Sequence, residues 1–265
     1  MTTALLLILG FFAGLLGALT GIGGGVILTP ILALHFGIPI RQAIGTSLVA
    51  VITTSAASSS VHLQRHTTDI RLGMTLELAT TLGAAVMAYL VGYFNRNVLE
   101  GLFAAFLLYS SIMILSKGGK VKDEDQSPPA LNGETVIPPY EPKRYPLGLG
   151  ASLVAGALSG LLGIGGGPIK VPVMFIFMNV PLIVATATSN FMIGCTAAAS
   201  AMVYYRRGDI LVQVTAPLAV GVFVGSLLGA RLAPRIHSKI VVYLLVAVML
   251  YLAGHLAIHL VQEVL

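Results

Sequence analysis

The chain contains the same glycine-rich motif twice, at a constant separation. Gly-Ile-Gly-Gly-Gly occupies residues 21–25 and recurs at residues 163–167, a shift of 142 positions. The same shift aligns further glycines, prolines and Thr-Ser pairs: Gly14 with Gly156, Pro30 with Pro172, Pro39 with Pro181, and Thr46-Ser47 with Thr188-Ser189. Self-similarity at a fixed period is the signature of an internal structural repeat. The sequence therefore predicts two related halves.

Both halves are too apolar for a water-soluble domain. Hydrophobic residues make up 56% of the 265 positions and charged residues 9%, against about 45–50% and about 25% in soluble domains. Apolar runs recur along the whole chain, near residues 4–20, 24–36, 43–61, 72–94, 98–116, 147–163, 168–178, 184–205, 210–232 and 237–262. Most of them reach the roughly 17–25 residues that a membrane-crossing helix needs. The chain is predicted to be an all-α integral membrane protein.

A polar segment separates the two halves. Residues 117–146 hold 10 of the 25 charged residues and six of the 13 prolines, without a periodic apolar pattern. Such a composition favours a flexible connection over a folded domain. We therefore divide the chain into a first membrane repeat at 1–116, a flexible linker at 117–146 and a second membrane repeat at 147–265.

The number of segments and the basic residues together predict an orientation. Each half holds about five hydrophobic segments, and an odd number of crossings inverts the second repeat relative to the first. Basic residues favour the cytoplasmic side, and they divide nine to four if the linker is cytoplasmic. The nine are Arg65, Arg71, Lys117, Lys120, Lys122, Lys143, Arg144, Arg235 and Lys239, and the four are Arg41, Arg96, Arg206 and Arg207. We expect a multi-pass protein of the cell membrane, with both termini extracytoplasmic.

The glycine clusters do not fit a dinucleotide-binding loop, because a membrane segment precedes the first cluster and no acidic residue follows it within 40 positions. Two explanations remain open. Glycines let helices approach closely in lipid, and the four-residue spacings that suit such packing are Gly10/Gly14, Gly17/Gly21, Gly156/Gly160 and Gly221/Gly225/Gly229. Three successive glycines, with a proline five positions beyond, instead favour a broken or re-entrant helix whose free N–H groups face an anion.

The doubled motif resembles one known family. The glycines and the following proline precede Ala43-Ile44-Gly45-Thr46-Ser47-Leu48 in the first copy and Ala185-Thr186-Ala187-Thr188-Ser189-Asn190 in the second. This pattern is similar to the sulfite exporter TauE/SafE family, also called toluene sulfonate uptake permeases, over nearly the whole chain apart from the linker. The resemblance implies a secondary carrier of small sulfur-containing anions such as sulfite, sulfoacetate or other organosulfonates.

The candidate substrate-binding residues gather around the two motifs; they are Gly23, Gly24, Gly25, Thr46, Ser47, Gly165, Gly166, Gly167, Lys170, Thr188, Ser189 and Asn190. Hydroxyls and the Asn190 amide can donate to sulfonate oxygens, although hydroxyls in membrane helices also bond to their own backbone. Lys170 is a charge inside an apolar segment, where it is either functional or extended towards the interface. Glu77 is a candidate proton-coupling carboxylate or an interfacial group.

The expected activity is secondary transport by alternating access, in the export direction and coupled to protons. The expected partners are a small sulfur-containing anion, membrane lipid and protons, with no nucleic acid; no segment indicates an oligomeric state. No catalytic residue, bound metal or cofactor is expected, because the polar segment is too short for an ATP-hydrolysing domain and a single Cys195 excludes a multi-cysteine metal site. A passive anion channel and a membrane scaffold protein remain as alternatives to a transporter.

Overall fold

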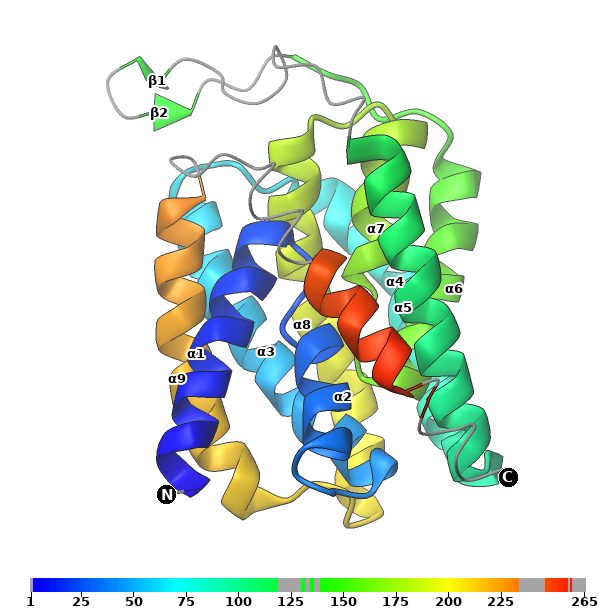
Figure 1. The fold of residues 1–265 in the computed structure, drawn as a ribbon. Coiled ribbons are helices and arrows are strands. Elements are labelled where there is room, and N and C mark those ends of the chain that lie inside the picture. The colour runs from blue at the N-terminus through cyan, green and yellow to red at the C-terminus, as the bar shows by residue number, and fades with distance from the viewer. Residues whose placement is uncertain are drawn as a thin grey trace.

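The computed structural model describes residues 2–118, 130–131, 134–135, 139–233, 246–256 and 258, which form a bundle of helices (Figure 1). The first half contains α1 (Thr2–Thr20), α2 (Gly25–Leu34), α3 (Ile40–Gln64), α4 (Ile70–Leu90), the short 3-10 turn η1 (Val91–Tyr93) and α5 (Arg96–Gly118). The second half contains α6 (Tyr145–Leu162), α7 (Gly167–Pro172), η3 (Val173–Phe177), α8 (Leu182–Arg206) and α9 (Val212–Leu232). A further helix covers Val246–Leu256.

Six of the described helical segments are long and apolar enough to cross a membrane. They are Thr3–Thr20, Ile40–Gln64, Ile70–Tyr93, Tyr145–Leu162, Leu182–Arg206 and Val212–Leu232. The helix α2 is shorter, and its ten residues extend about 15 Å, half of a hydrocarbon core of about 30 Å. The predicted all-α membrane architecture is confirmed for these segments.

The linker predicted at residues 117–146 lies mostly outside the described residues. Its first and last residues are helical, because α5 extends to Gly118 and α6 begins at Tyr145. Within it, the strands β1 (Ala130–Leu131) and β2 (Glu134–Thr135) form a small antiparallel pair. Its flexibility stays a prediction.

Glycines bring α1, from the first half, into backbone contact with α9, from the second. A Cβ atom placed on Gly221 would lie 2.1 Å from the carbonyl oxygen of Leu7, and one on Gly229 would lie 2.5 Å from that of Leu15. The contacts advance in the same direction along both helices, so α1 and α9 run parallel, side by side in Figure 1. Close packing at this glycine stripe is confirmed.

The same arrangement joins α6, from the second half, to α4, from the first. A Cβ on Gly156 would lie 1.9 Å from the carbonyl oxygen of Thr80, and one on Gly160 would lie 2.2 Å from that of Ala84. These helices also run parallel. Each of the two close pairs therefore contains one helix from each half, and in this way the halves interlock.

The long helices α3 and α8 also pack together, but they run antiparallel. Near the start of α3, Gly45 lies against the backbone of Asp209, which follows the end of α8. Further along α3, the hydroxyl of Ser55 donates to the carbonyl oxygen of Asn190, in the first half of α8, at 2.6 Å. The equivalent helices of the two repeats thus point in opposite directions where they touch.

The bundle is apolar outside and contains polar groups inside, as expected for a protein surrounded by lipid. Along α4, exposed apolar side chains recur every four residues at Ile70, Met74, Leu78, Leu82 and Val86. The opposite face of α4 buries Glu77 and Thr80 together with Gly83. Helices in membranes are held together by small residues and polar contacts, which explains why the interior carries hydroxyl and charged groups.

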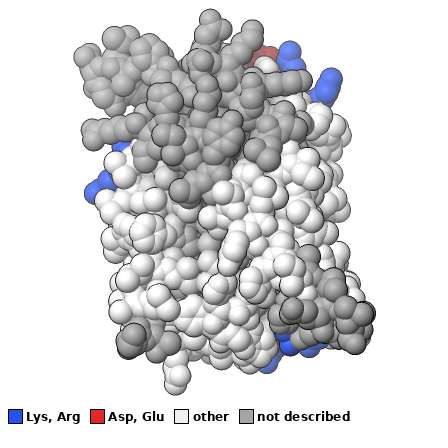
Figure 2. All heavy atoms as spheres, viewed as in Figure 1, with Lys and Arg blue, Asp and Glu red and all other residues white. Residues whose placement is uncertain are grey.

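Arginines at equivalent positions of the two repeats cap helices of the opposite half. Arg65 follows α3 and donates to the carbonyl oxygens of Ala230 and Arg231 at the end of α9, at 3.1 and 3.2 Å. Arg207 follows α8 and donates to the carbonyl oxygen of Tyr89 near the end of α4. A positive charge is favourable at the C-terminus of a helix. Figure 2 shows Lys and Arg towards the two ends of one face, with uncharged side chains between.

Candidate functional site

Each glycine cluster forms a loop that ends one helix and begins the next. Residues 21–24 join α1 to α2, and residues 163–166 join α6 to α7. Positive φ angles between 71° and 81° occur at Gly21, Gly23, Gly163, Gly165 and Gly166. Residues with a side chain rarely adopt this conformation. The predicted breaks in the helices are confirmed, and glycine is needed there because of its backbone freedom.

The two loops touch each other where the halves meet. A Cβ on Gly25 would lie 2.2 Å from the carbonyl oxygen of Gly163, and one on Gly167 would lie 2.4 Å from that of Gly21. The shift of 142 positions relates Gly25 to Gly167 and Gly21 to Gly163, so the contact is reciprocal. There is no space for a side chain at either crossing.

The helices that follow the two loops differ in what they can offer an anion. The helix α2 has no proline in its first turn, whereas α7, which continues into η3, carries Pro168 in its first turn. Proline has no N–H group. The N-terminus of α7 therefore presents fewer backbone donors than the sequence pattern implied, and the two halves do not contribute equally.

The serines of the two Thr-Ser pairs bond to the opposite loop. The hydroxyl of Ser189 donates to the carbonyl oxygen of Gly21 at 2.8 Å. The hydroxyl of Ser47 lies 3.3 Å from the carbonyl oxygen of Gly163, 2.9 Å from that of Ile44 and 2.6 Å from the hydroxyl of Thr29. Both serines are buried. Their hydroxyls connect the halves in addition to any contact with a ligand.

The threonines of the same pairs accept hydrogen bonds from the other half. The backbone N–H of Asp69 donates to the hydroxyl oxygen of Thr188 at 3.0 Å, and that of Leu211 donates to Thr46 at 3.3 Å. The sequence had suggested either a ligand or the residue's own helix as the partner. The observed partners are backbone N–H groups at the starts of α4 and α9. A role of these hydroxyls in substrate binding stays a prediction.

Asn190 is buried beside the first glycine loop. Its Nδ2 donates to the carbonyl oxygen of Ala18 at 3.1 Å, near the end of α1. Its Oδ1 atom has no hydrogen-bond partner among the described residues. The amide group therefore keeps a free acceptor at the interface of the two halves, although the sequence had singled it out as a donor.

Lys170 and Glu77, predicted separately, form one buried ion pair. The distance from Lys170 Nζ to Glu77 Oε2 is 3.2 Å; the lysine side chain is completely buried and that of the glutamate is 7% exposed. Neither side chain is exposed at the surface of the protein, so Lys170 does not extend to the outside of the bundle. The pair joins α7 of the second half to α4 of the first.

Two threonines that the sequence did not single out complete this cluster. Thr196 on α8 accepts from Lys170 Nζ at 3.0 Å and donates to Glu77 Oε1 at 2.6 Å. Thr81 on α4 donates to the same Glu77 oxygen at 2.9 Å. A signal was available for Thr81, because it follows Glu77 by one helical turn. No comparable signal existed for Thr196, which reaches the cluster only through the packing of α8 against α4.

The ion pair has no counterpart in the first repeat. The shift of 142 positions places Leu28 at the position of Lys170 and Thr54 at that of Thr196. Thr54 donates to its own helix, to the carbonyl oxygen of Ala50 at 3.1 Å. Both halves thus contain a glycine loop, whereas the buried Lys–Glu pair occurs once among the described residues.

Outside the membrane segments, the end of the linker is tied to the start of α4. The hydroxyl of Tyr140 donates to Asp69 Oδ2 at 2.7 Å, while Asp69 Oδ1 accepts from the backbone N–H of Leu72 at 2.9 Å. Partial burial, and then the hydrogen bond to the Asp69 carboxylate, raise the pKa of Tyr140. The linker therefore anchors the loop whose backbone N–H binds Thr188.

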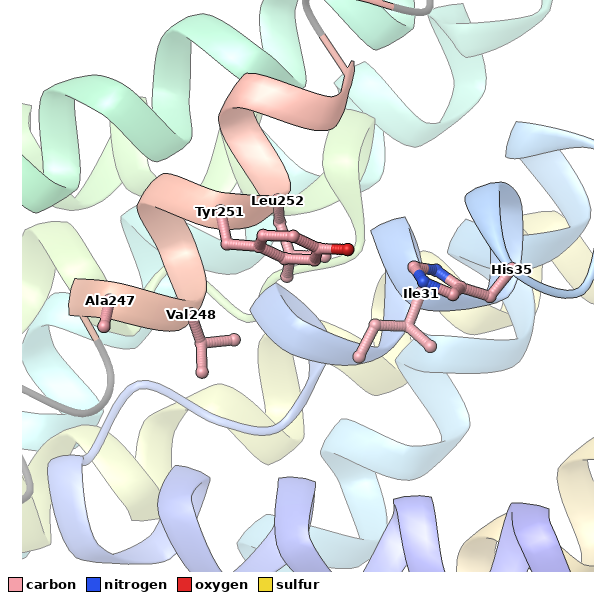
Figure 3. A pocket seen from close by; sticks show the side chains of 6 residues that line it. All are labelled: Ile31, His35, Ala247, Val248, Tyr251 and Leu252. Carbon is pink, nitrogen blue, oxygen red and sulfur yellow. The ribbon is translucent and has the colours of Figure 1, made fainter.

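A groove of about 440 Å³ lies away from this centre, between α2 and the helix over Val246–Leu256 (Figure 3). It is lined by Ile31, His35, Ala247, Val248, Tyr251 and Leu252. None of the predicted site residues contributes to it. The groove is distinct from the glycine loops and from the ion pair.

Comparison with known proteins agrees with the membrane architecture. Residues 6–256 match the family described as Sulfite exporter TauE/SafE. The chain is 31% identical over 204 residues to the "Probable membrane transporter protein YunE" of Bacillus subtilis (strain 168), covering 73% of this chain and 74% of that protein. It is 26% identical over 224 residues to YdhB of the same organism, a "Probable membrane transporter protein", with 83% and 87% covered. No solved structure gives a significant match.

Proposed function

The chain belongs to the sulfite exporter TauE/SafE family of membrane transporters, and on that premise we propose that it exports small sulfur-containing oxyanions such as sulfite, sulfoacetate or other organosulfonates. The export direction follows from the family name, sulfite exporter. A transporter of this family is not an enzyme, so the residues around the loops are assigned to binding and movement rather than to catalysis.

The observation that carries the proposal is the reciprocal contact of the two glycine loops, with Lys170 one helical turn beyond. Broken helices at membrane depth are tolerated where protein or a water-filled cavity satisfies their backbone groups. The breaks lie between the halves, which is where transporters built from repeats bind their substrates. The proposed substrate site comprises residues 23–25 and 165–167, the two Thr-Ser pairs, Asn190 and Lys170.

A full positive charge is needed because helix ends alone hold an anion weakly. A helix N-terminus contributes about 0.3–1 kcal/mol at an exposed site and up to about 2 kcal/mol in a partly buried one. Removing a small anion from water costs several kcal/mol. Lys170 lies beside the second glycine loop, because its backbone N–H donates to the Gly166 carbonyl oxygen at 3.2 Å. Within the described membrane segments, it is the cation next to such a loop.

Alternating access by two inverted repeats is the proposed mechanism of movement. One contact supports an inverted arrangement: the equivalent helices α3 and α8 run antiparallel where they pack together. Each close pair combines one helix from each half. When one repeat rocks against the other, the two repeats therefore have to move past each other at the contact between the loops. The loops are therefore the expected pivot.

The proposed orientation has a cytoplasmic linker and extracytoplasmic termini. It is supported by the nine-to-four division of basic residues and by the contacts of the arginines. Arg41 donates to the carbonyl oxygen of Phe94 at 2.7 Å, so the start of α3 and the end of η1 share one end of the bundle. Arg65 lies at the other end of α3, with the end of α9.

Counterflow in proteoliposomes separates a carrier from the two alternatives. Vesicles that contain the purified protein are loaded with unlabelled sulfite or sulfoacetate, and entry of the labelled anion is followed. A carrier should accelerate exchange when the same anion is present on the opposite side. Flux without this acceleration would indicate a channel, and the absence of flux would favour a scaffold; either result would contradict the proposal.

Lys170→Met tests the site itself. The variant should bind the anion more than tenfold more weakly, which corresponds to about 1.4 kcal/mol or more. Lys143→Met is the matched control, because this lysine is exposed in the linker and should leave the affinity unchanged. Lys170→Arg keeps the charge and should be less damaging, although the geometry of the guanidinium differs from that of the ammonium. Equal affinities in Lys170→Met and the control would remove Lys170 from the site.

A further inference from the structure

We propose that the Lys170–Glu77 ion pair couples the anion to one proton, because the anion and the Glu77 carboxylate compete for the same ammonium group. This inference rests on the proposed function. Binding of a monovalent anion displaces the carboxylate from Lys170, and Glu77 takes up one proton from water on the side to which the site is open. The anion and the proton bring no net charge into the protein.

The need for a proton follows from the burial of the pair. Both residues are buried, backbone included, so their two charges cancel inside the bundle. An anion that paired with Lys170 would leave the carboxylate without a cationic partner, away from water. An unpaired buried charge is strongly unfavourable, and a buried carboxylate avoids it by becoming neutral.

The ammonium group has one more N–H donor than the acceptors that the described residues supply. An ammonium carries three N–H donors, and the described residues supply two acceptors, the Glu77 carboxylate and the Thr196 hydroxyl. The methylene Cε of Lys170 packs beside the loop, since a Cβ on Gly166 would lie 3.4 Å from it. An anion at the loop can therefore reach the third donor before the carboxylate leaves.

Thr196 can satisfy both protonation states of Glu77. In the observed arrangement its hydroxyl donates to Glu77 Oε1 at 2.6 Å, and the carbonyl oxygen of Met192 lies 3.3 Å away as a second acceptor. When Glu77 is protonated, the hydroxyl hydrogen of Thr196 can turn to Met192, and the hydroxyl oxygen then accepts from the carboxylic acid. The hydrogen bond between Thr196 and Glu77 Oε1 is therefore kept in both protonation states.

Glu77 is the group that takes the proton, because few other titratable groups of the described residues face the pair. From α7 the facing charge is Lys170 itself, and from α8 the facing titratable group is the Cys195 thiol. The helix α6 carries no Asp, Glu, Lys or Arg in Tyr145–Leu162. On α4, Asp69 and Arg71 lie about two turns before Glu77. A thiol is ordinarily protonated at neutral pH, so it cannot accept the proton.

The cluster has no repeat-related copy among the described residues, and this sets the number of protons. Leu28 occupies the position of Lys170 in the first repeat, and no second buried Lys–Glu pair occurs among the described residues. A transporter with one such pair should take up one proton for each monovalent anion, although it has two glycine loops.

Calorimetry with methanesulfonate tests the stoichiometry directly. This sulfonate stays monovalent at neutral pH, so a pH effect reports on the protein. Titrations in buffers of different ionisation enthalpy give the number of protons taken up for each anion bound. Wild-type protein should take up close to one, and its affinity should fall about tenfold per pH unit between pH 6 and pH 8, as linkage to one proton requires.

Glu77→Gln mimics the protonated carboxylate and should bind the sulfonate without proton uptake, at an affinity independent of pH. Glu100→Gln is the matched control: it removes another buried carboxylate, on α5, where Arg96 lies 2.7 Å away, and it should keep the proton uptake of the wild type. The Lys170→Met/Glu77→Gln double variant removes both charges, so it should fold but not bind.

The possible failures are distinguishable. Wild-type binding without proton uptake, or unchanged uptake in Glu77→Gln, would overturn the coupling while leaving the proposed substrate class intact. A wild-type protein that binds neither methanesulfonate nor sulfite would overturn the substrate class, and the coupling with it. Tight binding by the double variant would show that the anion does not use Lys170.

Discussion

Ser47 and Ser189 direct their hydroxyls at each other's half: Ser189 donates to Gly21, and Ser47 lies within hydrogen-bond distance of Gly163. Both carbonyl groups belong to the first residue of a glycine loop. Where a helix breaks, its last carbonyl groups lose their partners within the helix, and buried carbonyl groups require new ones. Each serine thus compensates for the break in the other repeat.

Ser189→Ala should destabilise the protein because it leaves the buried Gly21 carbonyl without this donor. We expect the free energy of unfolding to fall by about 1–3 kcal/mol. Ser60→Ala is the control, since this exposed serine donates to the carbonyl oxygen of Ala57 in its own helix, and it should change stability by less than about 0.5 kcal/mol. Denaturant titration in mixed micelles measures both, and equal effects would contradict the structural role of Ser189.

Adjacent glycines of the first loop should respond differently to alanine. Gly24 has a φ of −69°, and its added Cβ would lie 3.2 Å from the nearest atom, the Ala13 carbonyl oxygen, so Gly24→Ala should fold. Gly25→Ala places its Cβ against the Gly163 carbonyl and should reduce the yield of monodisperse protein severely. Gly167→Ala should behave like Gly25→Ala. A well-folded Gly25→Ala protein would show that the loops do not touch as described.

Labelling of single cysteines tests the orientation of the chain. In a Cys195→Ala background, Glu141→Cys lies in the linker and should react with a membrane-impermeant maleimide after the cells are permeabilised. Asn97→Cys, at the start of α5, should react in intact cells. Both positions are exposed, so accessibility within the fold does not decide the result. The reverse pattern would place the linker outside the cytoplasm.

The bond between Tyr140 and Asp69 predicts a loss of stability at alkaline pH. Since folding raises the pKa of Tyr140, its contribution is fully present below the unfolded value of about 10 and is lost as the pH rises towards the folded value. Tyr140→Phe removes the hydrogen bond, worth about 0.5–1.5 kcal/mol, and should flatten this dependence between pH 10 and pH 11. Thermal unfolding at a series of pH values measures the slope. Identical slopes would assign the alkaline loss to another group.

Local signals in the sequence predict the helices and their breaks. Glycine at positive φ and proline inside an apolar run act on their own neighbours, so the loops at residues 21–24 and 163–166 could be located without a structure. The glycine stripes that join α1 to α9 and α4 to α6 were equally readable, because their spacing follows one face of a helix. Which helices they would join was not predictable from spacing.

Long-range partners could not be predicted in the same way. Lys170 and Glu77 are 93 positions apart, and hydropathy predicts that each is inside the membrane without giving the rotation of its helix. The sequence therefore did not exclude a position at the membrane interface for either residue. The partners of the Thr-Ser pairs were missed for a related reason. These partners are backbone groups of the opposite half, and they come close to the hydroxyls only when the two halves fold together.

The interlocked pairing of helices also has a consequence for how the protein is made. The glycines of α1 find their partner in α9, about 200 residues later in the chain. At a synthesis rate of about 5–20 residues per second, α1 remains in the bilayer for about 10–40 s before α9 leaves the ribosome. During this interval its glycine face is covered by lipid or by the insertion machinery. The first half cannot complete its packing during translation, and folding has to end after the last long helix has entered the membrane.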